Sequence, residues 1–235
     1  VLGRTERYYI KEYLEETNLK TYIALDTSAS MGFRSQTASM SKLDYAALLA
    51  AALTMLLIEQ RDAVGLATYD ETLHMIMPPR LTRSYAQQII KTLSQVKPAG
   101  KTASATALAR LAERITRRGL VIVISDFLDD LPTTVNALRR FHHAGCEVIL
   151  FHVMDPVERT LDLGNDVRLH DLETGEELLT QPAQLQASYQ EKVREFTEKL
   201  KRSAREMEMD YVLLDTHTPF DVALAEYLRK RKRLN

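Results

Sequence analysis

The chain has 235 residues, of which 45% are hydrophobic and 27% are charged, so it can bury one large core and does not have the composition of a disordered chain. Its formal net charge of -1 argues against nucleic acid or an anionic membrane surface as the main partner, because such binders usually carry a basic excess. The single cysteine, Cys146, excludes an internal disulfide framework and indicates a reducing compartment, so we expect a cytoplasmic protein.

The longest apolar stretch, residues 46–58, is shorter than the roughly 20 residues that a membrane-spanning helix needs. It therefore predicts a buried helix, and we expect no membrane span. The sequence opens on Val1 rather than methionine, which suggests that an upstream piece was removed or not included.

Short apolar runs without period-two alternation predict strands that are buried on both faces, and helical patterns lie between them. In chain order we predict strand 21–25, helix 42–60, strand 63–69, helix 84–95, helix 104–118, strand 120–125, helix 133–143, strand 147–153, helix 184–206 and strand 211–214. This alternation is typical of a three-layer, doubly wound α/β fold with a mainly parallel sheet.

Two segments depart from this alternation. After Tyr69, the sequence "YDETLHMIMPP" predicts a tight turn into one antiparallel edge strand that Pro78 and Pro79 stop. Residues 155–181 are polar and contain a turn around Gly175, which predicts a small surface insertion for which a hairpin is one possible form.

Oxygen-bearing side chains follow the first predicted strand. Asp26, Ser28 and Ser30 take alternate positions in "YIALDTSASMG", so an extended backbone would place them on one side. The strand "LVIVISD" ends in a second carboxylate, Asp126, and ligands of open α/β sheets bind at the carboxyl ends of the strands. Two carboxylates there would repel each other unless a cation lay between them, and hard oxygen ligands suit Mg²⁺ or Mn²⁺. An Asx turn, a serine turn or helix capping is the structural alternative.

The segment "DTSAS" resembles the Asp-x-Ser-x-Ser element of the von Willebrand factor A domain, whose metal-ion-dependent adhesion site is completed by a distant threonine and a distant aspartate. Here "GKTASATAL" offers Thr102, with Ser104 and Thr106 as nearby alternatives, and "ISDF" offers Asp126. The resemblance implies a strand order of 3-2-1-4-5-6, which places the two aspartates on neighbouring strands. It also implies that Mg²⁺, or else Mn²⁺ or Ca²⁺, is held by Asp26, Ser28, Ser30, Thr102 and Asp126.

Further segments, among them "RYYIKEYLEETN", "KLDYAALLAAAL", "DAVGLATYDE", "MDPVE" and "TPFDVALAEYLRKRKR", follow in order the pattern of the bacterial domain of unknown function 58 family. The chain is similar to that family over nearly its whole length. The resemblance implies a remnant of an upstream segment at residues 1–19, a von Willebrand factor A-like domain at residues 20–235, and association with MoxR-type AAA+ ATPases.

The resemblance therefore implies a non-enzymatic, divalent-metal-dependent protein–protein interaction module, in which a partner such as a MoxR-type ATPase offers a carboxylate to the metal. The alternative is a Mg²⁺-dependent, phosphatase-like hydrolase that uses Asp26, although Ser28 stands where such enzymes carry a second aspartate. Two other enzyme motifs are incomplete. "AGKT" lacks the first glycine of a phosphate-binding loop, since Gln95 stands there, and "SASMG" lacks the first glycine of a nucleophile elbow.

Several other residues receive simpler interpretations. Phe127 stands where many A domains have glycine and is expected to narrow the crevice, and Lys101 is expected to add a cation close to the metal. Ser41 and Asp44 have capping-box spacing, so Lys42 is interpreted as a residue of the first helical turn. The resemblance to A domains implies that residues 220–229 form a last helix that moves on metal ligation. The basic run from Leu228 predicts a solvated helix end, with a nucleic-acid contact as the alternative.

Overall fold

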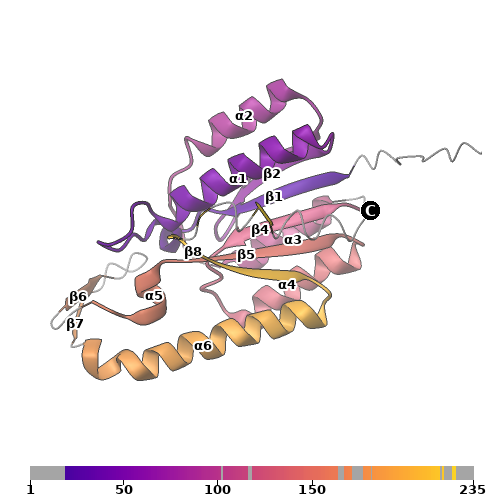
Figure 1. Ribbon diagram of the computed structural model, residues 1–235. Helices are drawn as coiled ribbons and strands as arrows, with labels where there is room; N and C mark the ends of the chain where they lie inside the picture. The colour runs from indigo at the N-terminus through magenta and orange to yellow at the C-terminus, as the bar shows by residue number, and fades with distance from the viewer. Residues whose placement is uncertain are drawn as a thin grey trace, which may run out of the picture.

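A six-stranded sheet forms the centre of the computed structural model (Figure 1), which describes residues 19–101, 103–115, 118–163, 167–170, 177–180, 182–217, 219 and 224–225. The strand order is β3-β2-β1-β4-β5-β8, and every neighbouring pair is parallel except β2 and β3. This is the mainly parallel, doubly wound arrangement with one antiparallel edge strand that the sequence predicts, in the order of a von Willebrand factor A-like fold. The strands are β1 (Lys20–Asp26), β2 (Ala63–Tyr69), β3 (Leu73–Arg80), β4 (Leu120–Ser125), β5 (Glu147–Met154) and β8 (Asp210–Asp215).

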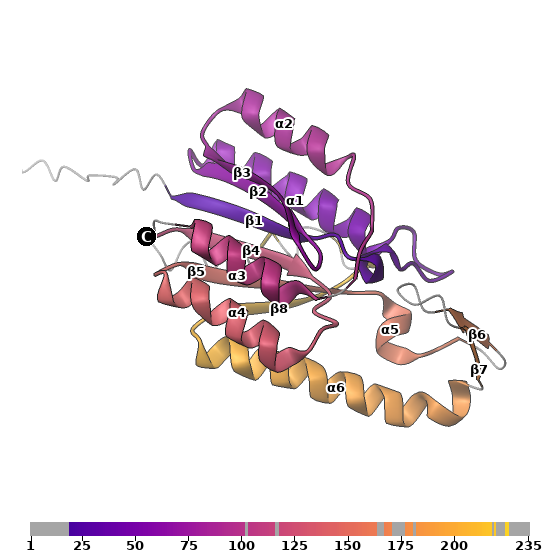
Figure 2. The same cartoon turned by 180° about the vertical axis from the view of Figure 1, so that it is seen from behind.

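Helices cover both faces of the sheet, which confirms the three-layer prediction. The helices α1 (Lys42–Glu59) and α2 (Arg83–Leu93) lie on one face, and α3 (Ser104–Arg114), α4 (Leu131–His143) and α6 (Pro182–Glu206) lie on the other (Figures 1 and 2). The central strands are buried on both faces for this reason. Along β4, for example, Ile122 packs on the α1 side and Val123 on the α3 side.

Two predicted boundaries are wrong. The third helix was expected to reach residue 118, but it ends at Arg114 because Ile115 leaves the helical region with φ -87° and ψ 99°. Pro78 and Pro79 do not stop the edge strand, which continues to Arg80. An edge strand tolerates proline because only one of its sides has to pair with a neighbouring strand.

The polar segment after β5 forms the predicted insertion. It contains the short helix α5 (Pro156–Thr160) and an antiparallel hairpin of β6 (Val167–His170) and β7 (Glu177–Thr180), while Gly175 lies outside the described residues. The hairpin, α5 and the loop that follows β1 lie at the same end of the molecule in both views (Figures 1 and 2). This is the end at which the parallel strands of the sheet finish.

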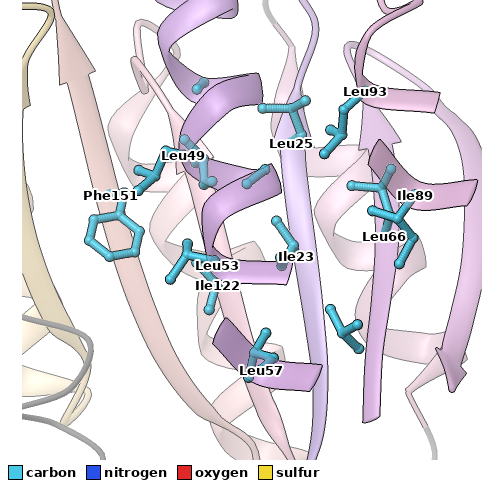
Figure 3. Close-up of a cluster of buried hydrophobic side chains, with 14 of the residues drawn as sticks. Ile23, Leu25, Leu49, Leu53, Leu57, Leu66, Ile89, Leu93, Ile122 and Phe151 are labelled. Carbon is cyan, nitrogen blue, oxygen red and sulfur yellow. The ribbon is translucent and has the colours of Figure 1, made fainter. Parts of the chain in front are cut away.

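One side of the core lies between α1 and the sheet. Figure 3 shows Leu49, Leu53 and Leu57 of α1 facing side chains of β1, β4 and β5, and these leucines are completely buried. Replacing Leu53 with alanine is expected to lower the free energy of unfolding by about 3 kcal/mol, because it removes buried apolar contacts and leaves a cavity. Urea unfolding of both proteins measures the difference, and a loss below about 1 kcal/mol would contradict this packing.

Some predictions fall on residues that the structure does not describe. These are the N-terminal extension up to residue 18, the basic run after Leu228, and the expected last helix apart from residues 224 and 225, which are helical. In the part of the chain that is described, no helix combines the length and the apolar character needed to cross a membrane.

Candidate metal centre

The two predicted carboxylates lie at the carboxyl ends of neighbouring strands. Asp26 is the last residue of β1, and Asp126 directly follows β4. The strands are paired in parallel with Leu25 opposite Ile124, so both aspartates leave the sheet at the same edge. This is the point at which successive connections turn to opposite sides of the sheet, where doubly wound folds bind ligands.

Asp26 is 1% exposed and accepts hydrogen bonds at both carboxylate oxygens. The Ser28 amide donates to Oδ1 over 2.9 Å, which is an Asx turn, and the Ser125 hydroxyl donates to Oδ2 over 2.6 Å. The pKa of Asp26 is raised to about 7, first by burial and second by repulsion from Asp126, while hydrogen bonds from Ser125 and Ser28 act to lower it. The charged form of this carboxyl group is therefore disfavoured in its buried position.

The two serine hydroxyls point toward each other, with 3.1 Å between their Oγ atoms. Ser28 is the N-cap residue of the 3-10 helix η1 (Ala29–Gly32), but its side chain makes no capping hydrogen bond, so capping does not account for this hydroxyl. Adjacent ligands of an octahedral ion with bonds of 2.0–2.1 Å are about 2.8–3.0 Å apart, so the observed spacing is close to that of two neighbouring positions around Mg²⁺. Ser30 also hydrogen-bonds toward Asp126 and favours its charged form.

Asp126 is 1% exposed and is compensated by a lysine. Its Oδ2 accepts from Lys42 Nζ over 2.7 Å, and its Oδ1 accepts from the Leu128 amide over 3.2 Å. Burial by itself would raise the pKa of Asp126, but the charge and hydrogen bond of Lys42 outweigh it and hold that pKa below its usual value. The pKa of Asp26 is thus raised, whereas that of Asp126 is lowered.

Lys42 is a component of the site that sequence reasoning missed. The capping box of Ser41 and Asp44 is confirmed, yet the Lys42 side chain turns inward, is 0% exposed and forms a second ion pair of 2.6 Å with Glu158. Burial works to lower the pKa of Lys42, and the charges of Asp126 and Glu158 raise it above its usual value. No local pattern signalled this burial, because a lysine in the first turn of a helix is usually solvated.

Thr102, the remaining predicted ligand, lies outside the described residues. The loop before it lies against the Asp26 loop, since the Ala29 amide donates to the Gly100 carbonyl over 3.2 Å and the Ala99 amide donates to the Thr27 carbonyl over 2.9 Å. Gly100 has φ +76°, and a Cβ there would come within 2.1 Å of Asp70 Oδ2, so glycine is required for this approach. The chain is thereby brought to the site immediately before Thr102.

Ser104, one alternative to Thr102, is hydrogen-bonded to Asp129. Its amide and its hydroxyl both donate to Asp129 Oδ2, over 2.8 and 3.0 Å, which anchors the start of α3 to the loop after β4. This pairing uses the Ser104 hydroxyl as a helix-terminal anchor rather than as a ligand.

The expected effect of Phe127 is not the observed one. Phe127 is buried beneath the site, where its ring packs against that of His152 with 5.7 Å between centroids, so it does not narrow the crevice. It adopts a left-handed φ of 51°, a conformation that favours glycine. Lys101 is exposed, and its expected closeness to a bound metal stays a prediction, while Lys42 is a cation within the described part of the site.

The described donors fit a hard divalent ion. They are hydroxyl and carboxylate oxygens, the chemistry that Mg²⁺ and Mn²⁺ prefer. No group of three or more histidine, cysteine, aspartate or glutamate side chains suited to a metal occurs among the described residues. As a phosphatase nucleophile, Asp26 would need an accessible oxygen, whereas both of its oxygens are buried and hydrogen-bonded.

The sheet order places the chain in the class of proteins with a von Willebrand factor A-like fold. Within this class, the chain belongs to the family described as protein of unknown function DUF58, whose model matches residues 1–199. Uncharacterized proteins of Mycobacterium bovis and Mycobacterium tuberculosis are 31% identical over 180 residues, which cover 74% of this chain and 55% of theirs. The chain thus spans about half the length of these curated relatives.

Solved structures share the fold at lower identity. The conserved hypothetical protein BatB of Bacteroides thetaiotaomicron matches 91% of this chain and 98% of its own, with a TM-score of 0.58 and 19% identity. An aerotolerance-related membrane protein of Bacteroides fragilis matches 83% of this chain and 90% of its own, with a TM-score of 0.57 and 21% identity. These similarities support the overall architecture of the domain.

Proposed function

We propose that this protein is a cytoplasmic, non-enzymatic interaction module that binds a protein partner through a divalent ion, Mg²⁺ or alternatively Mn²⁺ or Ca²⁺. The observation that supports it most directly is the convergence of Asp26, Ser28, Ser30 and Asp126 at one edge of the sheet, with the two serine oxygens 3.1 Å apart. Ser28 and Ser30, together with Thr102, would hold the ion, and the two aspartates would orient its water ligands.

The electrostatics of the site support the same proposal. Asp26 is a buried carboxyl group whose charged form is disfavoured by burial and by Asp126, so a bound cation would relieve an existing cost. With neutral hydroxyls as direct ligands, a bound ion would retain much of its positive charge and could attract a carboxylate offered by a partner. The protein itself would hold the hydroxyls of Ser28 and Ser30 in place and keep water away from the buried side of the site.

Calorimetric titration with Mg²⁺ and with Mn²⁺ tests the metal site. The wild-type protein is expected to bind one ion, and the Ser28→Ala, Ser30→Ala double variant is expected to lose at least about 2–3 kcal/mol of binding free energy, since it lacks two ligands. The Ser84→Ala, Ser94→Ala variant is the matched control, because it removes two exposed hydroxyls at the ends of α2. Equal affinity of the wild-type protein and the site variant would refute the metal site.

For the partner, we propose a MoxR-type AAA+ ATPase. The test is binding of a purified ATPase of this type from the same organism, measured with the wild-type protein and with the Ser28→Ala, Ser30→Ala variant. Comparing variants avoids a chelator, which would also remove Mg²⁺ from the ATPase. If both proteins bind the ATPase equally strongly, the binding does not depend on the metal site.

A further inference from the structure

The buried ammonium group of Lys42 lies between two carboxylates contributed by different elements. Lys42 begins α1, Asp126 follows β4 and Glu158 lies in α5, and the Nζ atom is 2.7 and 2.6 Å from their oxygens. The side chain of Lys42 is 0% exposed, that of Asp126 is 1% exposed and that of Glu158 is 16% exposed. Water therefore screens the Lys42–Asp126 pair very little.

Both the backbone and the side chain of Lys42 are fixed by contacts with Phe33. Its amide donates to the Phe33 carbonyl over 3.1 Å, and its ammonium lies 5.9 Å from the centroid of the Phe33 ring. Glu158 is fixed in turn, because its other carboxylate oxygen accepts from the Asp155 amide over 3.0 Å in the capping box of α5. The ammonium thus has a defined place beside Asp126 rather than a flexible one at the surface.

A positive charge fixed beside Asp126 has two consequences. It compensates the buried carboxylate when no metal is bound, which keeps the carboxyl ends of β1 and β4 assembled. It also repels a divalent ion that binds beside the same carboxylate, because like charges at short range in a poorly solvated site interact strongly. The first effect stabilises the empty site, and the second weakens the binding of an ion.

We propose that Lys42 is a built-in counter-ion of Asp126 that keeps the metal site assembled and limits its affinity for divalent ions. This inference rests on the proposed metal-binding function. In it Lys42 is a positioning residue, which acts through Asp126 and does not touch the ion.

The test is a charge-balanced double variant, Lys42→Met with Glu158→Gln, which removes one positive and one negative charge together. Glutamine keeps an oxygen for the capping box of α5. Calorimetry with Mn²⁺ and with Mg²⁺ is expected to show binding about tenfold or more tighter than in the wild-type protein, because the repelling ammonium is absent. Circular dichroism establishes that the variant is folded at the temperature of the titration.

Two further variants isolate the cause. Glu158→Gln alone retains the ammonium and is expected to bind metal no more tightly than the wild-type protein. Arg140→Met with Glu113→Gln makes the same change in an exposed ion pair between α3 and α4 and is expected to leave the affinity unchanged. If the wild-type protein binds metal and the Lys42→Met, Glu158→Gln variant binds it equally or more weakly, the inference is wrong. If neither protein binds metal, the proposed function itself fails.

Discussion

Replacing Lys42 with methionine alone is expected to lower the free energy of unfolding by about 3–5 kcal/mol at neutral pH, the range typical of breaking a buried ion pair by removing one partner. Methionine fills a similar volume, so the loss reflects electrostatics rather than a cavity. Asp126 would keep its hydrogen bond from the Leu128 amide but lose the charge that compensates it. Urea unfolding in the presence of a chelator measures the difference.

The pH dependence separates this effect from a packing defect. In the wild-type protein the pKa of Asp126 is depressed, so its contribution to stability is present above the unfolded-state pKa and is lost as pH falls through the folded-state pKa. Burial without Lys42 would raise the pKa of Asp126 in the variant, so the difference between the wild-type protein and the Lys42→Met variant should shrink as pH falls from neutral and be smallest below the folded-state pKa of the wild-type Asp126. Adding Glu158→Gln should recover part of the loss at neutral pH. A difference below about 1 kcal/mol at neutral pH would show that Asp126 does not depend on Lys42.

Replacing Asp26 with asparagine is expected to make the stability of the metal-free protein depend steeply on pH. In the wild-type protein two buried groups have opposite effects on the pH dependence of stability. The pKa of Asp26 is raised to about 7, whereas that of His152 is lowered to about 4, chiefly by burial and against the attraction of Asp126. Asp26 therefore stabilises the fold in acid, an effect lost as pH rises through about 7.

The contribution of His152 has the opposite sign. It is fully present above the unfolded-state pKa of about 6.5 and is lost as pH falls through the folded-state pKa of about 4. Between these two pKa values, the contributions of Asp26 and His152 to the slope of the unfolding free energy against pH cancel in the wild-type protein. In Asp26→Asn the His152 slope remains, so the free energy of unfolding should rise by about 1.4 kcal/mol per pH unit, or about 3 kcal/mol over the window.

The mirror variant, His152→Gln, provides the control, because glutamine can still hydrogen-bond to Tyr211, whose hydroxyl is 2.7 Å from His152 Nδ1. Its stability should fall as pH rises from about 4 to about 7, since only the Asp26 slope remains. Urea unfolding across this range, with chelator present, gives both slopes. Other titrating carboxyl groups contribute similarly to all three proteins, so identical slopes in wild type and variants would contradict the assigned directions.

The local pattern of the sequence determined the architecture and the carboxylates of the site. Apolar runs such as residues 120–125 predict buried parallel strands because both faces of such a strand are covered by helices. The alternate spacing of Asp26, Ser28 and Ser30 predicts a shared side because it depends only on backbone geometry over a few residues. The pairing of β1 with β4 then followed from the strand order implied by the family resemblance.

Only the tertiary structure decided the electrostatics around those residues. Lys42 is 84 residues from Asp126 and 116 residues from Glu158 in the chain, so no local spacing links them. A lysine in the first turn of a helix is usually solvated, and it is buried here because α1, β4 and α5 meet above the end of the sheet. The charge of each aspartate depends on burial and on these distant neighbours, which sequence spacing does not contain.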